Sequence, residues 1–175
     1  MGNPAPRAVL VDGYNVLHAI PRFAPRGGDL SAARERFESW LTRAAAEACV
    51  RECFLVWDGR GGQRQRRAGP VTILYTAAGV SADDRLLALC RGPFAARAAT
   101  TWVVSSDRDV QQPARELGFF VLGAMAFHRR WSPAVGPATG DPRRGDHHDA
   151  APGSPSAAEV DLLLAEFLEA DRGPR

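Results

Sequence analysis

Five aspartates stand at positions where their carboxylates could act together. Asp12, Asp58 and Asp107 come at or just after the ends of apolar runs, and Asp83 and Asp84 open a predicted helix. Ligands of open parallel sheets bind beyond the carboxyl ends of the strands. If these runs are parallel strands, four or five carboxylates gather at one edge of the sheet.

Carboxylates that lie close together repel each other, so they must be protonated or neutralised by a cation. Ligand sets made of oxygen alone favour Mg²⁺ or Mn²⁺ over zinc. Such an ion activates water and stabilises charge on a phosphate, and two ions about 4 Å apart serve both the attacking and the leaving oxygen. The aspartates therefore predict a metal site for phosphate hydrolysis.

Each aspartate taken alone has a structural explanation. Asp12 precedes a glycine and could cap a turn, and Asp58 could lie at the rim of the sheet. Asp83 and Asp84 could serve the dipole of their helix, and Asp107 could be an N-cap. The arrival of all five at one predicted edge favours the metal site.

The polar neighbours of the aspartates also have two explanations each. Asn15 could hold a metal-bound water or a phosphate oxygen, or it could be a turn residue. Asp109 could be a ligand or a solvated residue at a helix start. Ser105 and Ser106 could donate hydrogen bonds to phosphate or to the aspartates.

A loop rich in glycine, glutamine and arginine follows Asp58. Its arginines could bind an RNA backbone with salt-dependent affinity, or they could be solvated residues of a flexible loop. Because the loop leaves the same edge as the aspartates, we favour RNA binding. Arg108 could contact phosphate or neutralise a carboxylate, and Tyr14 could stack on a base, although a packed tyrosine is the favoured interpretation. The loop arginines are Arg60, Arg64, Arg66 and Arg67.

Buried strands alternate with helices along the chain, which predicts an α/β fold with a parallel sheet and helices on both faces. Ser81 and Asp84 form a capping box at the second helix. Pro113 predicts the start of the third helix, and Gly118 its end. Strands are predicted at 8–11, 53–57, 71–75, 101–104 and 119–122, and helices at 31–50, from 81 and at 113–118.

The 175 residues suit one domain with some chain to spare. Residues 1–131 form that domain, 132–156 are predicted to be a disordered linker, and 157–175 a C-terminal helix and tail that docks on the domain or holds a partner. The net charge of +2 is only mildly basic, so charge alone names no nucleic-acid ligand. No apolar run or leader predicts membrane insertion or secretion, so we expect a cytoplasmic protein. Cys49, Cys53 and Cys90 are predicted to be small core residues.

Several motifs occur in the order of a known family. The segment Val-Asp-Gly-Tyr-Asn-Val-Leu at 11–17 resembles the opening signature of NYN domains, within the PIN-like nuclease superfamily. The segments at 75–76, 81–84, 104–108 and 114–118 are similar to its YacP-like branch. The resemblance covers about residues 7–130.

This resemblance implies a PIN-like three-layer α/β/α fold with a central parallel sheet, and metal-dependent endonucleolytic cleavage of RNA. It places the metal on Asp12, Asp83 and Asp107, with Asn15 and Asp84 in support. Asp84 stands where the branch often has glutamate, and a shorter carboxylate would move the metal or bind it through water. The resemblance also implies action on messenger RNA, near the ribosome.

Two other functions fit the same residues. A non-catalytic module of this fold would bind RNA or the ribosome and need no metal. A metal-dependent phosphatase or nucleotidase would act on small substrates, although the arginine loop favours a polymer. The sequence leaves open the oligomeric state, the number of metal ions and the RNA that is cut.

Overall fold

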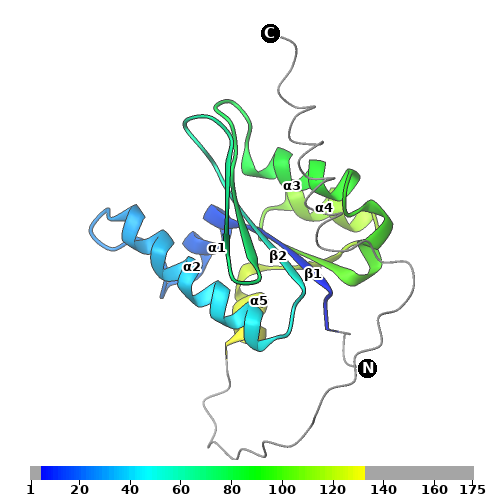
Figure 1. Ribbon diagram of the computed structural model, residues 1–175, viewed down its shortest axis with the longest axis horizontal. Coiled ribbons are helices and arrows are strands. Elements are labelled where there is room, and N and C mark those ends of the chain that lie inside the picture. Colours follow the sequence, from blue (N-terminus) through cyan, green and yellow to red (C-terminus); the bar gives the residue numbers. More distant parts are fainter. Residues whose placement is uncertain (1–4, 133–175) are drawn as a thin grey trace, which may run out of the picture. The chain divides into compact units, whose positions relative to one another are not determined.

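A computed structural model describes residues 5–132, which contain one mixed sheet of six strands in the order β3-β4-β2-β1-β5-β6 (Figure 1). Five strands are parallel, and β3 pairs antiparallel with β4 at one edge. The predicted α/β fold is confirmed, with β1 at the centre. The strands are β1 (Ala8–Asp12), β2 (Glu52–Trp57), β3 (Arg64–Ala68), β4 (Val71–Tyr75), β5 (Thr101–Val104) and β6 (Phe120–Leu122).

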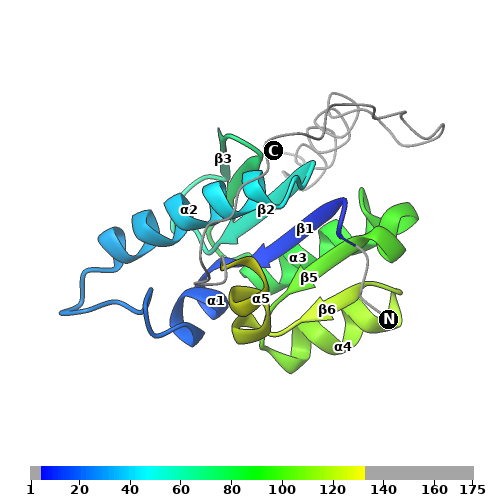
Figure 2. The same cartoon turned by 90° about the horizontal axis from the view of Figure 1, so that it is seen from below.

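Helices cover both faces of the sheet, with α1, α2 and α5 on one side and α3 and α4 on the other (Figures 1 and 2). A short 3-10 helix, η1, leads into β5. The helices are α1 (Gly13–Ala19), α2 (Leu30–Glu47), α3 (Ala82–Arg91), η1 (Ala95–Thr100), α4 (Arg108–Glu116) and α5 (Ala124–Trp131).

The central strand β1 is buried on both faces, which explains its unbroken apolar run. Val9 and Val11 join a cluster that includes Phe37 of α2 and Phe127 of α5. Successive side chains of a strand point to opposite faces, so the buried Leu10 between them faces α3 and α4. The strand that ends in Asp12 is therefore held from both sides.

The prediction of a loop over residues 60–67 is wrong for its second half. Arg64 to Ala68 form the edge strand β3, in which Arg66 pairs with Ile73 of β4. This strand carries no apolar alternation because its side chains are largely exposed and its order comes from backbone pairing. Charged side chains on an edge strand also oppose pairing with another chain.

Helix boundaries differ from the pattern at several points. The helix predicted for 31–50 ends at Glu47, and Cys49 is exposed in a turn with φ 52°, so its assignment to the core is wrong. Cys53 and Cys90 are buried, as predicted. The sequence pattern also gives no sign of α1, η1 or α5, because these helices are short. In addition, α1 follows β1 without an intervening loop.

The position predicted for Pro113 is wrong, because α4 begins at Arg108 and encloses the proline. The true start is set by Asp107, whose carboxylate caps the helix. Gly118 follows the end of α4 with φ 87°, a left-handed conformation that glycine adopts readily, so the predicted end is confirmed.

The described residues belong to one compact unit that ends at Ser132. None of their helices combines the length and apolar character needed to cross a membrane. The linker and C-terminal helix predicted beyond Ser132 lie outside the described residues.

The turn from β1 into α1 requires a residue without a side chain. A Cβ at Gly13 would lie 2.6 Å from the Val56 carbonyl oxygen and overlap the Trp57 ring. We expect Gly13→Ala to lower the free energy of unfolding by about 1–3 kcal/mol through overpacking, as measured by urea denaturation. Gly61→Ala is the matched control, since a Cβ there meets nothing within 4 Å. Equal losses in both variants would contradict this account.

Candidate active site

The site lies where the chain leaves β1 and β5 in opposite directions. From β1 the chain passes to β2 on one side, and from β5 it passes to β6 on the other. Such a switch point leaves a crevice beyond the carboxyl ends of the two strands. The register pairs Val11 with Val104, which brings the next residues, Asp12 and Ser105, together.

Asp12 is the buried carboxylate of the site, with 3% of its surface exposed. Ser105 Oγ donates to its Oδ2 at 2.9 Å, and the Asn15 N–H donates to its Oδ1 at 3.2 Å. Burial raises the pKa of Asp12 to about 7, although both hydrogen bonds oppose that rise. Asp12 therefore caps α1 and also places a carboxylate in the crevice.

Asp83 is the carboxylate on which the others converge. Desolvation by burial is the largest cause that raises its pKa, and the negative charges of Asp107, Asp58 and Asp84 raise it further. A hydrogen bond with the Asp12 carboxyl acts in the opposite direction. The five aspartates singled out in the sequence thus share one electrostatic neighbourhood.

Three of these aspartates also make hydrogen bonds at the start of a helix. Asp58 Oδ1 accepts from the Ala82 N–H at 2.7 Å, at the first residue of α3. Asp107 Oδ1 accepts from the Asp109 N–H at 2.9 Å and caps α4. Asp84 accepts from Ser81 Oγ at 2.7 Å within the predicted capping box. Capping and clustering therefore coexist, because α1, α3 and α4 all begin at this edge.

Polar contacts tie the loop after β5 to the neighbouring helices. The Ser106 N–H donates to Asn15 Oδ1 at 2.6 Å, and Ser106 Oγ accepts from the Ala124 N–H at 3.0 Å. Ser105, besides donating to Asp12, accepts from the Asp107 N–H at 3.1 Å. The oxygen of Asn15 is thus engaged in the fold and joins the start of α1 to the loop after β5.

The donor set suits a hard cation such as Mg²⁺, because it consists of carboxylate oxygens, and the buried Asp12 beside the half-buried Asp83 is electrostatically unfavourable without a positive charge. Among residues 5–132, however, no group of three or more His, Cys, Asp or Glu side chains is already arranged around a metal position. The carboxyl groups of Asp12 and Asp83 act directly on each other's pKa, and Asp107 acts on Asp83 through its charge. Mg²⁺ usually keeps several waters and binds through one or two carboxylates plus substrate phosphates, so this pair fits it.

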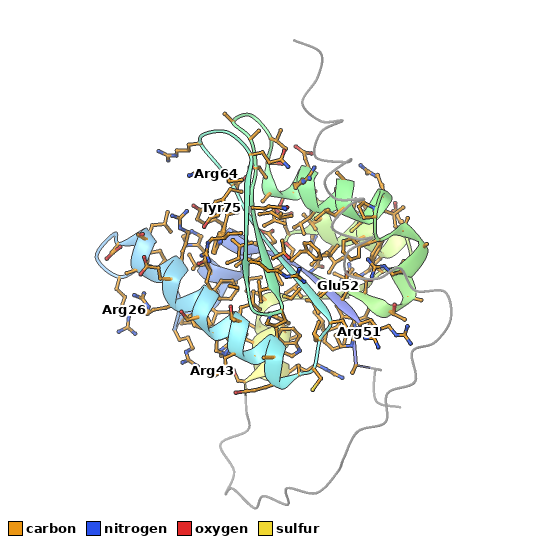
Figure 3. All side chains as sticks on the ribbon, in the orientation of Figure 1. Arg26, Arg43, Arg51, Glu52, Arg64 and Tyr75 are labelled. Atoms are coloured by element: carbon orange, nitrogen blue, oxygen red, sulfur yellow. The ribbon has the colours of Figure 1, made fainter. Side chains whose placement is uncertain are left out.

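A cleft of about 690 Å³ adjoins the aspartates and shares Asp58 with them. Three of the five arginines predicted to bind RNA, Arg60, Arg64 and Arg66, line it, whereas Arg67 and Arg108 do not. Figure 3 shows Arg64 and Tyr75 together, far from Arg51 and Glu52 at the start of β2. The other charged or aromatic lining residues are Arg34, Tyr14 and Tyr75.

Glu38 of α2 is a buried carboxylate that the pattern did not single out. It accepts from Trp57 Nε1 at 2.9 Å and Tyr75 OH at 3.4 Å, and it forms an ion pair with Arg66. Its position three residues before the buried Leu41 was the available sign that it faces the sheet. Since Glu38 neutralises Arg66, the charge offered to a ligand comes mainly from the other arginines of the cleft.

Residues 9–134 match the YacP-like NYN domain family. A crystal structure of Rae1 (YacP) from Bacillus subtilis is similar, with a TM-score of 0.58, 18% identity and coverage of 94% of this chain and 79% of that chain. A crystal structure of a mutant form of Rae1 from the same organism has a TM-score of 0.58 and 21% identity, and the match covers 71% of this chain and 74% of that chain. At these identities the likeness shows a shared fold. A search of curated proteins found no match.

The buried Asp12 makes stability depend on pH when no metal is added. Its folded-state pKa of about 7 exceeds the unfolded value of 3.8, so its stabilising contribution is complete below about pH 4 and is lost as pH rises through about 7. We expect the protein in EDTA to lose about 3 kcal/mol of unfolding free energy between pH 5 and pH 8, relative to Asp12→Asn. Denaturant titrations at both pH values measure this, and parallel profiles for the two proteins would refute the assignment.

Proposed function

Because the chain belongs to the YacP-like NYN domain family and has the fold of PIN-like nucleases, we propose that it is a metal-dependent endoribonuclease that hydrolyses phosphodiester bonds in RNA. The observation that carries the proposal is the contact between the buried Asp12 and Asp83, at a strand switch point beside an arginine-lined cleft. A buried carboxylate beside a second, half-buried carboxylate is unfavourable in a purely structural role. A bound cation would neutralise the two carboxylates and so stabilise their arrangement.

Asp12, Asp83 and Asp107 would hold Mg²⁺ or Mn²⁺, with Asp84 in support through water. When bound, the ion would lower the pKa of the attacking water and neutralise charge developing on the phosphate. Asp84 is exposed and bonded to Ser81, which suits an indirect role.

The chain's own residues orient the reacting groups. Ser105 and the Asn15 N–H restrain both oxygens of Asp12, so this carboxylate needs little reorganisation when substrate arrives. The Nδ2 group of Asn15 donates to a phosphate oxygen. Arg60 and Arg64 hold the phosphates that flank the cut bond. The exposed Arg108 contacts the RNA backbone beside Asp107.

The same proposal covers the finer expectations from the resemblance. The substrate is messenger RNA, encountered at the ribosome in the cytoplasm. A protein that binds RNA without cutting it is the competing function, and the lack of a preassembled three-residue metal group among the described residues is the observation in its favour. Dependence of activity on the metal separates the two.

The first test is cleavage of a labelled single-stranded RNA of mixed sequence with Mg²⁺, with Mn²⁺ and with EDTA. We expect internal cuts that require metal and that fall about 100-fold or more in Asp12→Asn, since the variant removes charge from the metal site. Glu116→Gln is the control, because Glu116 is an exposed carboxylate at the far end of α4.

Full activity of Asp12→Asn would eliminate the proposed site. If the wild-type protein does not cut free RNA, translating ribosomes are added to the same assay. Continued inactivity there would support the binding module, and competition by mononucleotides would identify a nucleotidase.

The arginines of the cleft should determine how binding depends on salt. In Asp12→Asn, which binds without cutting, we expect Arg60→Ala and Arg64→Ala each to reduce the slope of log affinity against log salt by about 0.7, the value for one phosphate contact on a single strand. Filter binding at several salt concentrations measures the slope. Arg91→Ala is the control, because Arg91 is exposed at the end of α3 and outside the cleft. An identical slope in all variants would place RNA elsewhere.

A further inference from the structure

We propose that the cleft beside the aspartates is a nucleobase site, which takes one unpaired base of the RNA strand and so makes the protein selective for single-stranded RNA. The inference rests on the proposed function only in taking RNA as the ligand. It is argued from the aromatic rings, the arginines and the position of the cleft.

Both tyrosines of the chain line this cleft. Tyr14 is half-buried and meets Trp57 edge-on, with 4.8 Å between ring centroids. Tyr75 is also half-buried, and its hydroxyl is anchored to the buried Glu38. Each ring is therefore held by packing and polar contacts on one side while another part borders the cleft. Rings restrained in this way can stack on a base without a large loss of conformational entropy.

Two guanidinium groups accompany the rings. Arg34 donates from Nη1 to Tyr14 OH at 3.3 Å, and its Cζ lies 6.0 Å from the centre of the Tyr75 ring. Arg64 approaches the same ring, with its Cζ 5.7 Å from the centre. Both aromatic rings and guanidinium planes stack on unpaired bases in RNA complexes. A surface that binds only phosphates would need the charges but would not need the two tyrosines.

The position of the cleft relates the base to the cutting site. Asp58 belongs to the cleft lining and its charge also acts on Asp83, so the cleft begins where the aspartate cluster ends. Tyr14 is two residues after Asp12. A base in the cleft would therefore belong to a nucleotide close to the scissile phosphate, with Arg60 and Arg64 near the adjoining backbone.

The size of the cleft agrees with a single nucleotide. Its volume of about 690 Å³ falls within the range of roughly 300–1,000 Å³ typical of pockets for small ligands. A base inside a duplex is stacked on both faces and paired along its edge, so it cannot enter such a site without unpairing. Selectivity for unpaired RNA follows.

Because Tyr14 and Tyr75 are the only tyrosines, they allow a direct spectroscopic test. Asp12→Asn protein containing 3-fluorotyrosine should give two ¹⁹F resonances, assigned with Tyr14→Phe and Tyr75→Phe. We expect a short single-stranded oligoribonucleotide with Mg²⁺ to shift both resonances. The duplex of the same sequence, and an abasic ribose-phosphate oligomer of the same length, should leave both near their free positions.

Equal shifts with the abasic oligomer would overturn the proposal and make the cleft a phosphate site. Bound single strand that shifts neither resonance would overturn it by placing the RNA elsewhere. The measurement requires no cleavage, so an inactive wild-type protein would remove the proposed nuclease function and leave a base-binding cleft intact.

Affinity gives a second, independent readout. Tyr75→Leu should weaken binding of single-stranded RNA by about tenfold or more, whereas Tyr75→Phe keeps the ring and should keep the affinity. Thermal unfolding of each variant shows that the comparison is made on folded protein. Equal affinities of the Leu and Phe variants would exclude stacking on Tyr75.

Discussion

The burial of one carboxylate at the end of the central strand is the constraint on which the rest of the site depends. Asp12 ends β1, the strand packed on both faces, and two hydrogen bonds restrain its oxygens. An ionised group in that position is costly unless it is paired or neutralised, which is why its pKa rises to about 7. The fold therefore favours an Asp12 carboxylate that is protonated or bound to a cation over one that is ionised and unpaired.

The remaining aspartates approach this group because helix starts and strand ends meet at the same edge. Asp58 and Asp107 each accept a hydrogen bond from a backbone N–H at the beginning of a helix. The positive end of the helix dipole favours carboxylates there, and this interaction offsets part of their mutual repulsion. The hydrogen bonds at the helix starts thus hold the carboxylates close together, although their negative charges repel each other.

A second buried carboxylate organises the neighbouring cleft. Glu38 links α2 to three strands through Trp57, Arg66 and Tyr75. Loss of one partner from such a network leaves polar groups buried without compensation. The network also separates two kinds of arginine in β3, since Arg66 is paired with Glu38 while Arg64 lies beside Tyr75 at the cleft. The aspartate site and the cleft are consequently built on different carboxylates but on the same sheet.

Apolar runs, cap residues and motif order in the sequence were sufficient to predict the α/β fold, the five parallel strands and the approach of Asp12, Asp83 and Asp107. These features follow from local chemistry and from the rule that parallel strands end at a common edge. Tertiary structure alone decided that the arginine segment forms an edge strand, because backbone pairing with β4 leaves no periodic signal in exposed side chains. It alone placed Arg34 and Tyr75 around one cleft, since α2 and β4 are brought together by packing that no short segment encodes.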